Sequence, residues 1–393
     1  MQKRAVFDGN QAGAMSLKSV KINCRQATAD DESSKKRKAV KKLTPVGVVG
    51  RLALGVLTVE LVVLLLLGGV IGLRQSGANS LRKGVDSSGP SLDSGLEEDD
   101  PASNWQEGWV RHDGKVYEYN DDILTFLFLG IDKMEKVSPN PDLVSGGQSD
   151  AIFLLVVDTA AKDMCLVGVN RDTIVDIRMV GIGDDGEDII FPAQLTVQHG
   201  FGDGMEGSCQ MTEEAVSKLF YGLPIHGYVS FNMGGIAELN DAIGGVELEI
   251  LEDLPKVHKN WTKGTQVKLE GMDAFWYVKY RDTTIFESAR GRLARQKQYL
   301  GLFAKQAIAA TKKDITLPVT LYGTLKDYIV TDISVDEMTY LASELVNYQF
   351  DIDEIYTMEG TTIRAEKFEE FYPDKDALRD LIIKVFYREV SRY

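Results

Sequence analysis

Carboxylates stand at the ends of two expected strands, from which side chains can converge on one edge of a sheet. Asp132 closely follows the apolar run Ile123–Leu129, and Asp150 immediately precedes the run Ala151–Val157. Two carboxylates at one sheet edge can hold a hard cation such as Mg²⁺. Because Asp at a strand end is more often a turn or capping residue, the spacing alone favours a structural role over a metal site.

Cationic residues form a second group, located after a third apolar run and near the start of an expected helix. This group, with its polar neighbours, comprises Arg171, Asp172, Lys279, Arg281, Arg292, Arg295 and Gln296. Positions 292, 295 and 296 share one face at helical spacing. Arginine side chains bind phosphate oxygens bidentately, and several together can neutralise a pyrophosphate. Without further context, the residues favour the alternative of a solvated basic helix face.

The elements that must position these residues are read from hydrophobic patterning. Ile123–Leu129, Ala151–Val157 and Cys165–Val169 are continuous apolar runs, which are typical of strands buried on both faces. Helical patterns follow over Glu213–Tyr221, with Thr212 as its expected N-cap, and over 291–311. Strands that alternate with helices predict an α/β fold, with a mixed central sheet covered by helices on both faces.

A long apolar segment precedes this region. The stretch from Leu52 to Leu73 is long enough to cross a bilayer at about 1.5 Å per residue. Basic residues cluster before it and an acidic run, 97–100, follows it, so the positive-inside rule places the N-terminus in the cytoplasm. Glu60 lies near the middle of the span, where it is either a functional or partner-contacting group or a tolerated protonated carboxyl.

Five segments follow from these patterns. We expect a basic disordered cytoplasmic tail over 1–45, a transmembrane helix over 46–74 and a flexible acidic linker over 75–104. The main domain is expected outside the membrane over 105–334, followed by a C-terminal helical extension packed on it over 335–393. The chain is therefore predicted to be a single-pass protein of the cell membrane.

Charge and cysteine content exclude several function classes. The formal net charge of -15 argues against nucleic acid as a partner, because a phosphate backbone requires a positive surface. The three cysteines lack metal-ligand spacing, and Cys165 falls in an expected buried strand, so a bridge to Cys209 is not favoured. Signatures of phosphate-binding loops, zinc peptidases and serine hydrolases are absent from the sequence.

Between Ile123 and Leu300, several blocks resemble the LytR-CpsA-Psr family of cell-envelope glycopolymer transferases in order and spacing. These blocks are FLFLGID, QSDAIFLLVVDTAAKDMCLVGVNRDTIVDI, LPIHGYVSFNMGGIAELNDAIGGVELEI and AFWYVKYRD…GRLARQKQYL. The resemblance implies an α/β/α domain outside the membrane with an apolar groove for a polyprenyl pyrophosphate. It implies a membrane-anchored transferase that moves a glycopolymer from this carrier onto peptidoglycan as a phosphodiester.

The resemblance also assigns roles to residues. It implies that Asp132 and Asp150 bind Mg²⁺, and that Arg171, Asp172 and Arg281 are catalytic, with Asp172 as a candidate general base. It implies that substrate is bound by Arg292, Arg295, Gln296, Lys279, Gln148 and Gln194.

Three positions depart from the family pattern. Gln148 stands where the family usually has Arg, Gln194 where it usually has Lys, and Lys279 where it usually has Arg. His199 lies in the changed segment around Gln194, although a lone His is more often structural. Because two cations are lost, a non-catalytic receptor for polyprenyl-linked lipids remains an alternative, as does a regulatory or scaffold protein of the envelope.

The predicted topology can be tested on intact protoplasts. Because the basic cluster precedes Leu52, protease added from outside should remove residues C-terminal to the membrane segment and spare the N-terminal tail. Terminal epitope tags and immunoblotting give the readout. A protected C-terminal domain would show that the orientation is inverted.

Overall fold

The computed structural model describes residues 75–81, 88–95, 105–139, 145–183, 186–282, 284–285, 288–366 and 368–390, except for the side chains of 289, 352 and 353. The expected cytoplasmic tail, the expected transmembrane segment 46–74 and Glu60 lie outside these residues. Within them, no helix combines the length and apolar character needed to cross a membrane.

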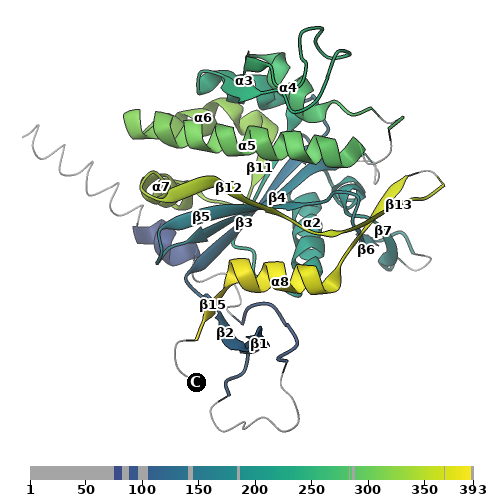
Figure 1. The fold of residues 1–393 in the computed structure, drawn as a ribbon, viewed down its shortest axis with the longest axis vertical. Helices are drawn as coiled ribbons and strands as arrows, with labels where there is room; N and C mark the ends of the chain where they lie inside the picture. The colour runs from purple at the N-terminus through teal and green to yellow at the C-terminus, as the bar shows by residue number, and fades with distance from the viewer. Residues whose placement is uncertain are drawn as a thin grey trace, which may run out of the picture. The chain divides into compact units, whose positions relative to one another are not determined.

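A six-stranded sheet forms the centre of the domain (Figure 1). Its order is β11 (Ile329–Thr331), β8 (Tyr228–Asn232), β3 (Ile123–Ile131), β4 (Ser149–Asp158), β5 (Asp163–Val169) and β12 (Gln349–Thr357). β3 pairs in parallel with β8 and β5 with β12, whereas β4 runs antiparallel to both of its neighbours. The sheet is therefore mixed, and the three apolar runs of the sequence are its adjacent central strands.

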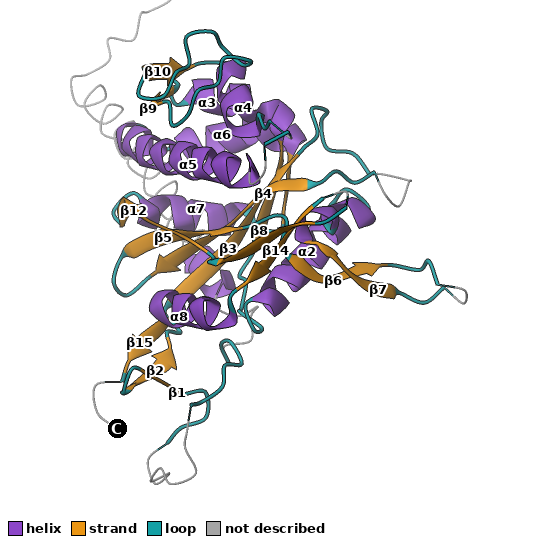
Figure 2. Ribbon diagram, turned by 45° about the vertical axis from the view of Figure 1, so that its right-hand side comes forward, coloured by secondary structure: helices purple, strands orange, loops and turns teal. Residues whose placement is uncertain are grey.

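Helices cover both faces of this sheet, which gives three layers (Figure 2). One face packs on α2 (Glu206–Leu219) and α8 (Lys375–Phe386), and the other on α5 (Ser288–Lys313) and α7 (Val335–Leu345). Alternation along β3 makes this possible, because Leu127 faces the first cluster of side chains and Phe126 the second. The predicted α/β class with a mixed, doubly covered sheet is confirmed.

Smaller elements surround these layers. Beyond α5 lie α3 (Ile236–Ala242), α4 (Met272–Lys279), α6 (Leu317–Leu325) and the ribbon of β9 (Val246–Glu249) and β10 (Gln266–Leu269). β6 (Ile174–Met179) and β7 (Ile189–Gln194) form a hairpin, while β1 (Val110–His112), β2 (Lys115–Tyr119) and β15 (Tyr387–Glu389) form a separate sheet. Short 3₁₀ turns cover Leu195–Val197, His199–Phe201, Met233–Gly235 and Lys326–Tyr328.

α2 begins earlier than the sequence predicts. The Asp203 carboxylate accepts hydrogen bonds from the backbone N–H groups of Met205 at 2.8 Å and Ser208 at 3.0 Å, so it satisfies the free donors of the first turn. Thr212 consequently lies inside the helix, where its hydroxyl donates to the Ser208 carbonyl. The expected N-cap at Thr212 is wrong, because a stronger acceptor is available upstream.

The C-terminal segment is not simply the helical extension expected over 335–393. It contributes α7 and α8, but also β12 at one edge of the central sheet and the hairpin of β13 (Gly360–Arg364) and β14 (Glu369–Pro373). β12 pairs with β5 in parallel, so this segment completes the domain. Cys165 and Cys209 are free, which confirms that they do not pair.

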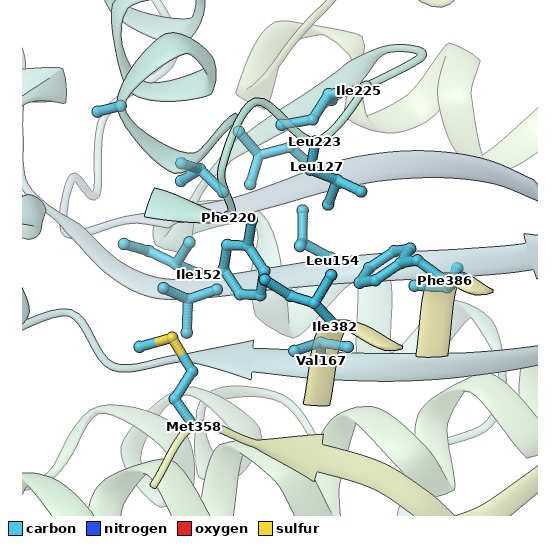
Figure 3. Packing of buried hydrophobic residues seen from close by; sticks show 14 of the residues in the cluster. Leu127, Ile152, Leu154, Val167, Phe220, Leu223, Ile225, Met358, Ile382 and Phe386 are labelled. Atoms are coloured by element: carbon cyan, nitrogen blue, oxygen red, sulfur yellow. The ribbon is translucent and has the colours of Figure 1, made fainter. Parts of the chain in front are cut away.

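The core beneath α2 and α8 allows a direct test of this packing (Figure 3). Leu154 on β4 is fully buried at 0% exposure, so Leu154→Ala leaves a cavity and should lower the free energy of unfolding by about 2–5 kcal/mol. Ile190→Ala on β7, where the side chain is 62% exposed, should change it by less than about 0.5 kcal/mol. Equal losses in urea denaturation would contradict the assigned core.

Candidate functional site

Cationic side chains from three parts of the sequence line one cavity of about 470 Å³. Arg171 follows β5, Arg281 follows α4, and Arg292 lies in the second turn of α5. Lys279 and Gln194 also line it. The predicted convergence of the three arginines is therefore confirmed, whereas their role towards a ligand stays a prediction.

Asp150 holds two of these arginines together. Its carboxylate pairs with the guanidinium of Arg171, and its second oxygen lies 3.4 Å from Nη1 of Arg292. Asp150 and Arg292 are both buried. A buried ion pair of this kind is costly to break, because the remaining charge loses its partner. Asp150 thus fixes the positions from which the arginines face the cavity.

Asp172 lines the cavity and contacts two of its arginines. Its carboxylate lies 3.1 Å from Nε of Arg171 and 3.9 Å from Nη1 of Arg281. It also accepts a 2.8 Å hydrogen bond from the Gln194 amide. Asp172 is only 2% exposed, so these donors stabilise a charge that would otherwise be costly to bury. Gln194 donates where a Lys would also donate, but it contributes no positive charge.

The arginines repel one another despite these carboxylates. Burial lowers the pKa of Arg292 to about 9, and the positive charges of Arg171 and Arg281 act in the same direction. Among the described residues that line the cavity, five side chains are cationic and three are acidic. An anion in the cavity would relieve this repulsion, so the electrostatics favour an anionic ligand.

Arg295 and Gln296 do not line this cavity. Arg295 pairs with Glu252 at 2.9 Å and donates to the backbone carbonyls of Tyr277 and Tyr280. It therefore ties α5 to the C-terminal end of α4, which is a structural role that the sequence does not predict. The Gln296 amide contacts the backbone carbonyls of Asp150 at 3.4 Å and Val278 at 3.3 Å.

The two aspartates implied as metal ligands differ in their surroundings. The Asp132 carboxylate accepts a 2.7 Å hydrogen bond from the backbone N–H of Gln148, whereas Asp150 is engaged by arginines. The Gln148 side chain is exposed and does not line the arginine cavity. Across the part of the chain that the structure describes, no group of three or more His, Cys, Asp or Glu residues could hold a metal.

His199 has a structural role. It is 1% exposed, and its Nδ1 lies 3.1 Å from the Gly146 carbonyl and 3.2 Å from that of Gly147. Burial lowers the pKa of His199 to about 4, so the imidazole is neutral near pH 7. This ring supports the loop before Gln148 and lies outside the arginine cavity.

An apolar cavity of about 310 Å³ lies farther along α5. Arg292 lines the arginine cavity, and the following turns of the same helix supply Gln296, Tyr299 and Phe303 to the apolar one. Its opposite wall comes from β3, β4 and β8, including Phe128 and Phe153. One helix thus leads from a cationic cavity to a space suited to a hydrocarbon.

The C-terminal segment supplies site residues that the sequence analysis missed. Glu369 lies 3.3 Å from Nη2 of Arg281, and Arg364 and Phe368 also line the cavity. The Gln194 amide donates to the Glu369 backbone carbonyl at 2.7 Å. No local motif marks Glu369, because its proximity to Arg281 arises only when β14 folds back against Asp172 and Thr173, just after β5.

The arginine cavity should bind inorganic pyrophosphate. Arg281→Ala removes a charged hydrogen-bond donor worth about 1.5–3 kcal/mol, so the Kd should rise about 10–100-fold. Arg178→Ala is the control, because Arg178 pairs with Asp188 and Glu214 and does not line the cavity. Calorimetric titration of the full chain in detergent measures both. Equal affinity in the Arg281→Ala protein would show that the anion binds elsewhere.

Comparisons with known proteins identify relatives of this chain. The model of the LytR-CpsA-Psr family (LytR_cpsA_psr) matches residues 92–382. A protein of Oceanobacillus iheyensis named polyisoprenyl-teichoic acid–peptidoglycan teichoic acid transferase TagU is 29% identical over 252 residues, which is 62% of this chain and 70% of that protein. The TagU of Halalkalibacterium halodurans is 28% identical over 246 residues, 62% of this chain and 72% of that protein.

Solved structures show the same fold. A Streptococcus agalactiae protein aligns with a TM-score of 0.52 at 18% identity, over 67% of this chain and 86% of that chain. An Enterococcus faecalis protein described as a transcriptional regulator aligns with a TM-score of 0.50 at 19% identity, over the same shares. Because the family model spans most of the sequence, including the segments that build both cavities, this chain belongs to the LytR-CpsA-Psr family.

Proposed function

We propose that this protein is a transferase that moves a glycopolymer from a polyprenyl-pyrophosphate carrier onto peptidoglycan as a phosphodiester. The observation that carries the proposal is that α5 lines two cavities in succession, a cationic one and then an apolar one. A polyprenyl pyrophosphate has the same order of chemistry, an anionic head on a hydrocarbon chain. The relatives named TagU are transferases between a polyisoprenyl-linked teichoic acid and peptidoglycan, which supports this substrate class.

In the proposed reaction, a peptidoglycan hydroxyl attacks the phosphorus bonded to the glycan. The new O–P bond forms as the bond to the bridging oxygen breaks, and polyprenyl phosphate leaves. Negative charge spreads over phosphate oxygens, so catalysis is mainly positioning and electrostatic stabilisation. Arg171, Arg281 and Arg292 supply the positive charge that stabilises these oxygens, and Asp172 accepts the proton of the hydroxyl in this proposal. Lys279 and Gln194 add donors to the same cavity.

We further propose that Mg²⁺ binds with the substrate. Mg²⁺ typically takes one or two protein carboxylates together with substrate phosphate oxygens, so it does not need a cage of three carboxylates. Asp132 and Asp150 stand at the adjoining ends of β3 and β4, and either one or both would hold the ion. When bound, the metal would neutralise charge on the phosphates. Asp150 would then have to share its carboxylate between the ion and Arg171 or Arg292.

The segment over 46–74 is proposed to anchor the domain in the cell membrane, with the N-terminus in the cytoplasm. This rests on its apolar sequence and its basic flank. A polyprenyl carrier is itself a membrane lipid, so an anchored enzyme meets its donor in the same bilayer.

A lipid receptor without catalysis is the second candidate. The observation that favours it is that Gln194 occupies a site position where a cation is usual in the family, and its amide bonds to Asp172 instead of adding positive charge. A receptor would bind the lipid through the same cavities but would not turn it over.

The deciding experiment uses the full chain in detergent, a synthetic polyprenyl-pyrophosphate oligosaccharide and a peptidoglycan oligomer, with and without Mg²⁺. Arg171→Ala should lower the transfer rate by about 10²–10³-fold, as the loss of other electrostatic stabilisers does. Arg178→Ala should behave as wild type, since its side chain lies outside the cavity. Product is measured by mass spectrometry. Tight lipid binding with no phosphodiester under any divalent metal would support the receptor instead.

A further inference from the structure

A second polar cavity, of about 500 Å³, adjoins the arginine cavity. Its lining comes from the end of β5, the start of α5, and the β12–β13 and β14 segments, and includes Asn170, Arg290, Glu359 and Thr362. Arg171, Arg281 and Arg292 line the first cavity and not this one. The two spaces therefore differ in chemistry, since amide, hydroxyl and carboxylate groups replace the dense cationic lining.

Asp172 and Glu369 line both cavities. Both side chains are largely buried, with 2% and 7% exposure, so they form the wall between the two spaces. Arg171 and Gln194 hold Asp172 from the cationic side, and Arg281 holds Glu369 at 3.3 Å. Two carboxylates are thus fixed between a cavity suited to phosphate and a cavity suited to hydroxyl groups.

The two shared carboxylates lie where the proposed reaction needs a proton acceptor. In the proposed reaction, a hydroxyl attacks a phosphate that the three arginines hold. Its proton must be accepted as the O–P bond forms, so the hydroxyl has to approach beside a carboxylate. Carboxylates also orient hydroxyl groups by accepting their hydrogen bonds. A sugar in the second cavity could place one hydroxyl at Asp172 and Glu369 and keep its remaining polar groups against Asn170, Glu359 and Thr362.

We propose that the second cavity is the acceptor subsite and binds a sugar unit of the peptidoglycan glycan strand, and that Glu369 contacts the acceptor hydroxyl. This inference rests on the proposed transferase function. In this proposal the C-terminal β12–β14 segment selects the acceptor, while Arg171, Arg281 and Arg292 bind the donor. The proton of the attacking hydroxyl passes to Asp172. The bond between the glycan-bonded phosphorus and the bridging oxygen breaks, and polyprenyl phosphate leaves with that oxygen.

Two threonines on β13 provide a matched pair of variants. Thr362 lines the second cavity, and its neighbour Thr361 projects from the opposite face of the same strand. Thr362→Trp fills the cavity with a side chain that suits a strand, and Thr361→Trp makes the same change where the cavity is not affected. Glu369→Gln keeps the shape of the wall and removes its charge.

Binding is measured with a synthetic tetrasaccharide of alternating N-acetylglucosamine and N-acetylmuramic acid, using the full chain in detergent and maltotetraose as the control sugar. A steric block in Thr362→Trp should raise the Kd for the tetrasaccharide about tenfold or more. Thr361→Trp should match wild type. Loss of a charged hydrogen bond in Glu369→Gln should raise the Kd about 10–100-fold. Pyrophosphate affinity in Thr362→Trp should stay at the wild-type value, which shows that the protein is folded.

Transfer and binding together separate the two proposals. If wild type transfers glycan and Thr362→Trp transfers equally well, the acceptor assignment is wrong and the transferase proposal stands. If wild type binds the tetrasaccharide but makes no product, and Thr362→Trp loses that binding, the cavity binds glycan and the transferase proposal is wrong. If wild type does not bind the tetrasaccharide, or binds maltotetraose as tightly, the acceptor subsite is overturned.

Discussion

Crowding of positive charge in a partly buried cavity is the constraint on which the site depends. Burial of Arg292 lowers its pKa, and the positive charges of Arg171 and Arg281 act in the same direction. Asp150 and Asp172 offset this repulsion by pairing with the arginines. Removing Asp150 would take from the buried Arg292 the carboxylate it pairs with, which is the costly case for a buried ion pair. The residual repulsion is what an anionic ligand would relieve.

α5 lines both the cationic and the apolar cavity, so it connects the two parts of a site suited to an amphiphilic ligand. Arg292 faces the cationic cavity, and residues one to three turns later, such as Gln296 and Phe303, face the apolar one. Arg295 lies between them in sequence but faces α4, where it bonds to the backbone carbonyls of Tyr277 and Tyr280. The helix is thereby fixed in rotation, so that its cationic and apolar residues remain aligned with the two cavities.

The C-terminal segment completes the site as well as the sheet. β12 pairs with β5 and β14 brings Glu369 to Arg281, so Asp172 and Glu369 line one cavity although they are far apart in sequence. Glu369 thus adjoins both the arginines and the second polar cavity, where our proposal places the incoming hydroxyl group. A family member with a different β12–β14 segment could keep the donor cavity and change the acceptor.

The sequence by itself determined the three central strands and the long helix α5, because buried strands and helical periodicity are local signals. The converging arginines were predicted through the family resemblance, since the residues alone favoured a solvated helix face. The sequence did not determine the edge pairing of β12 or the start of α2, which depend on distant strands and on the capping carboxylate of Asp203. It also could not separate Arg292 from Arg295. Both lie on the same side of one helix by spacing, and only packing against α4 turned Arg295 to backbone carbonyls. Glu369 entered the site for the same reason, since tertiary contacts brought its charge to Arg281 without any local pattern to mark it.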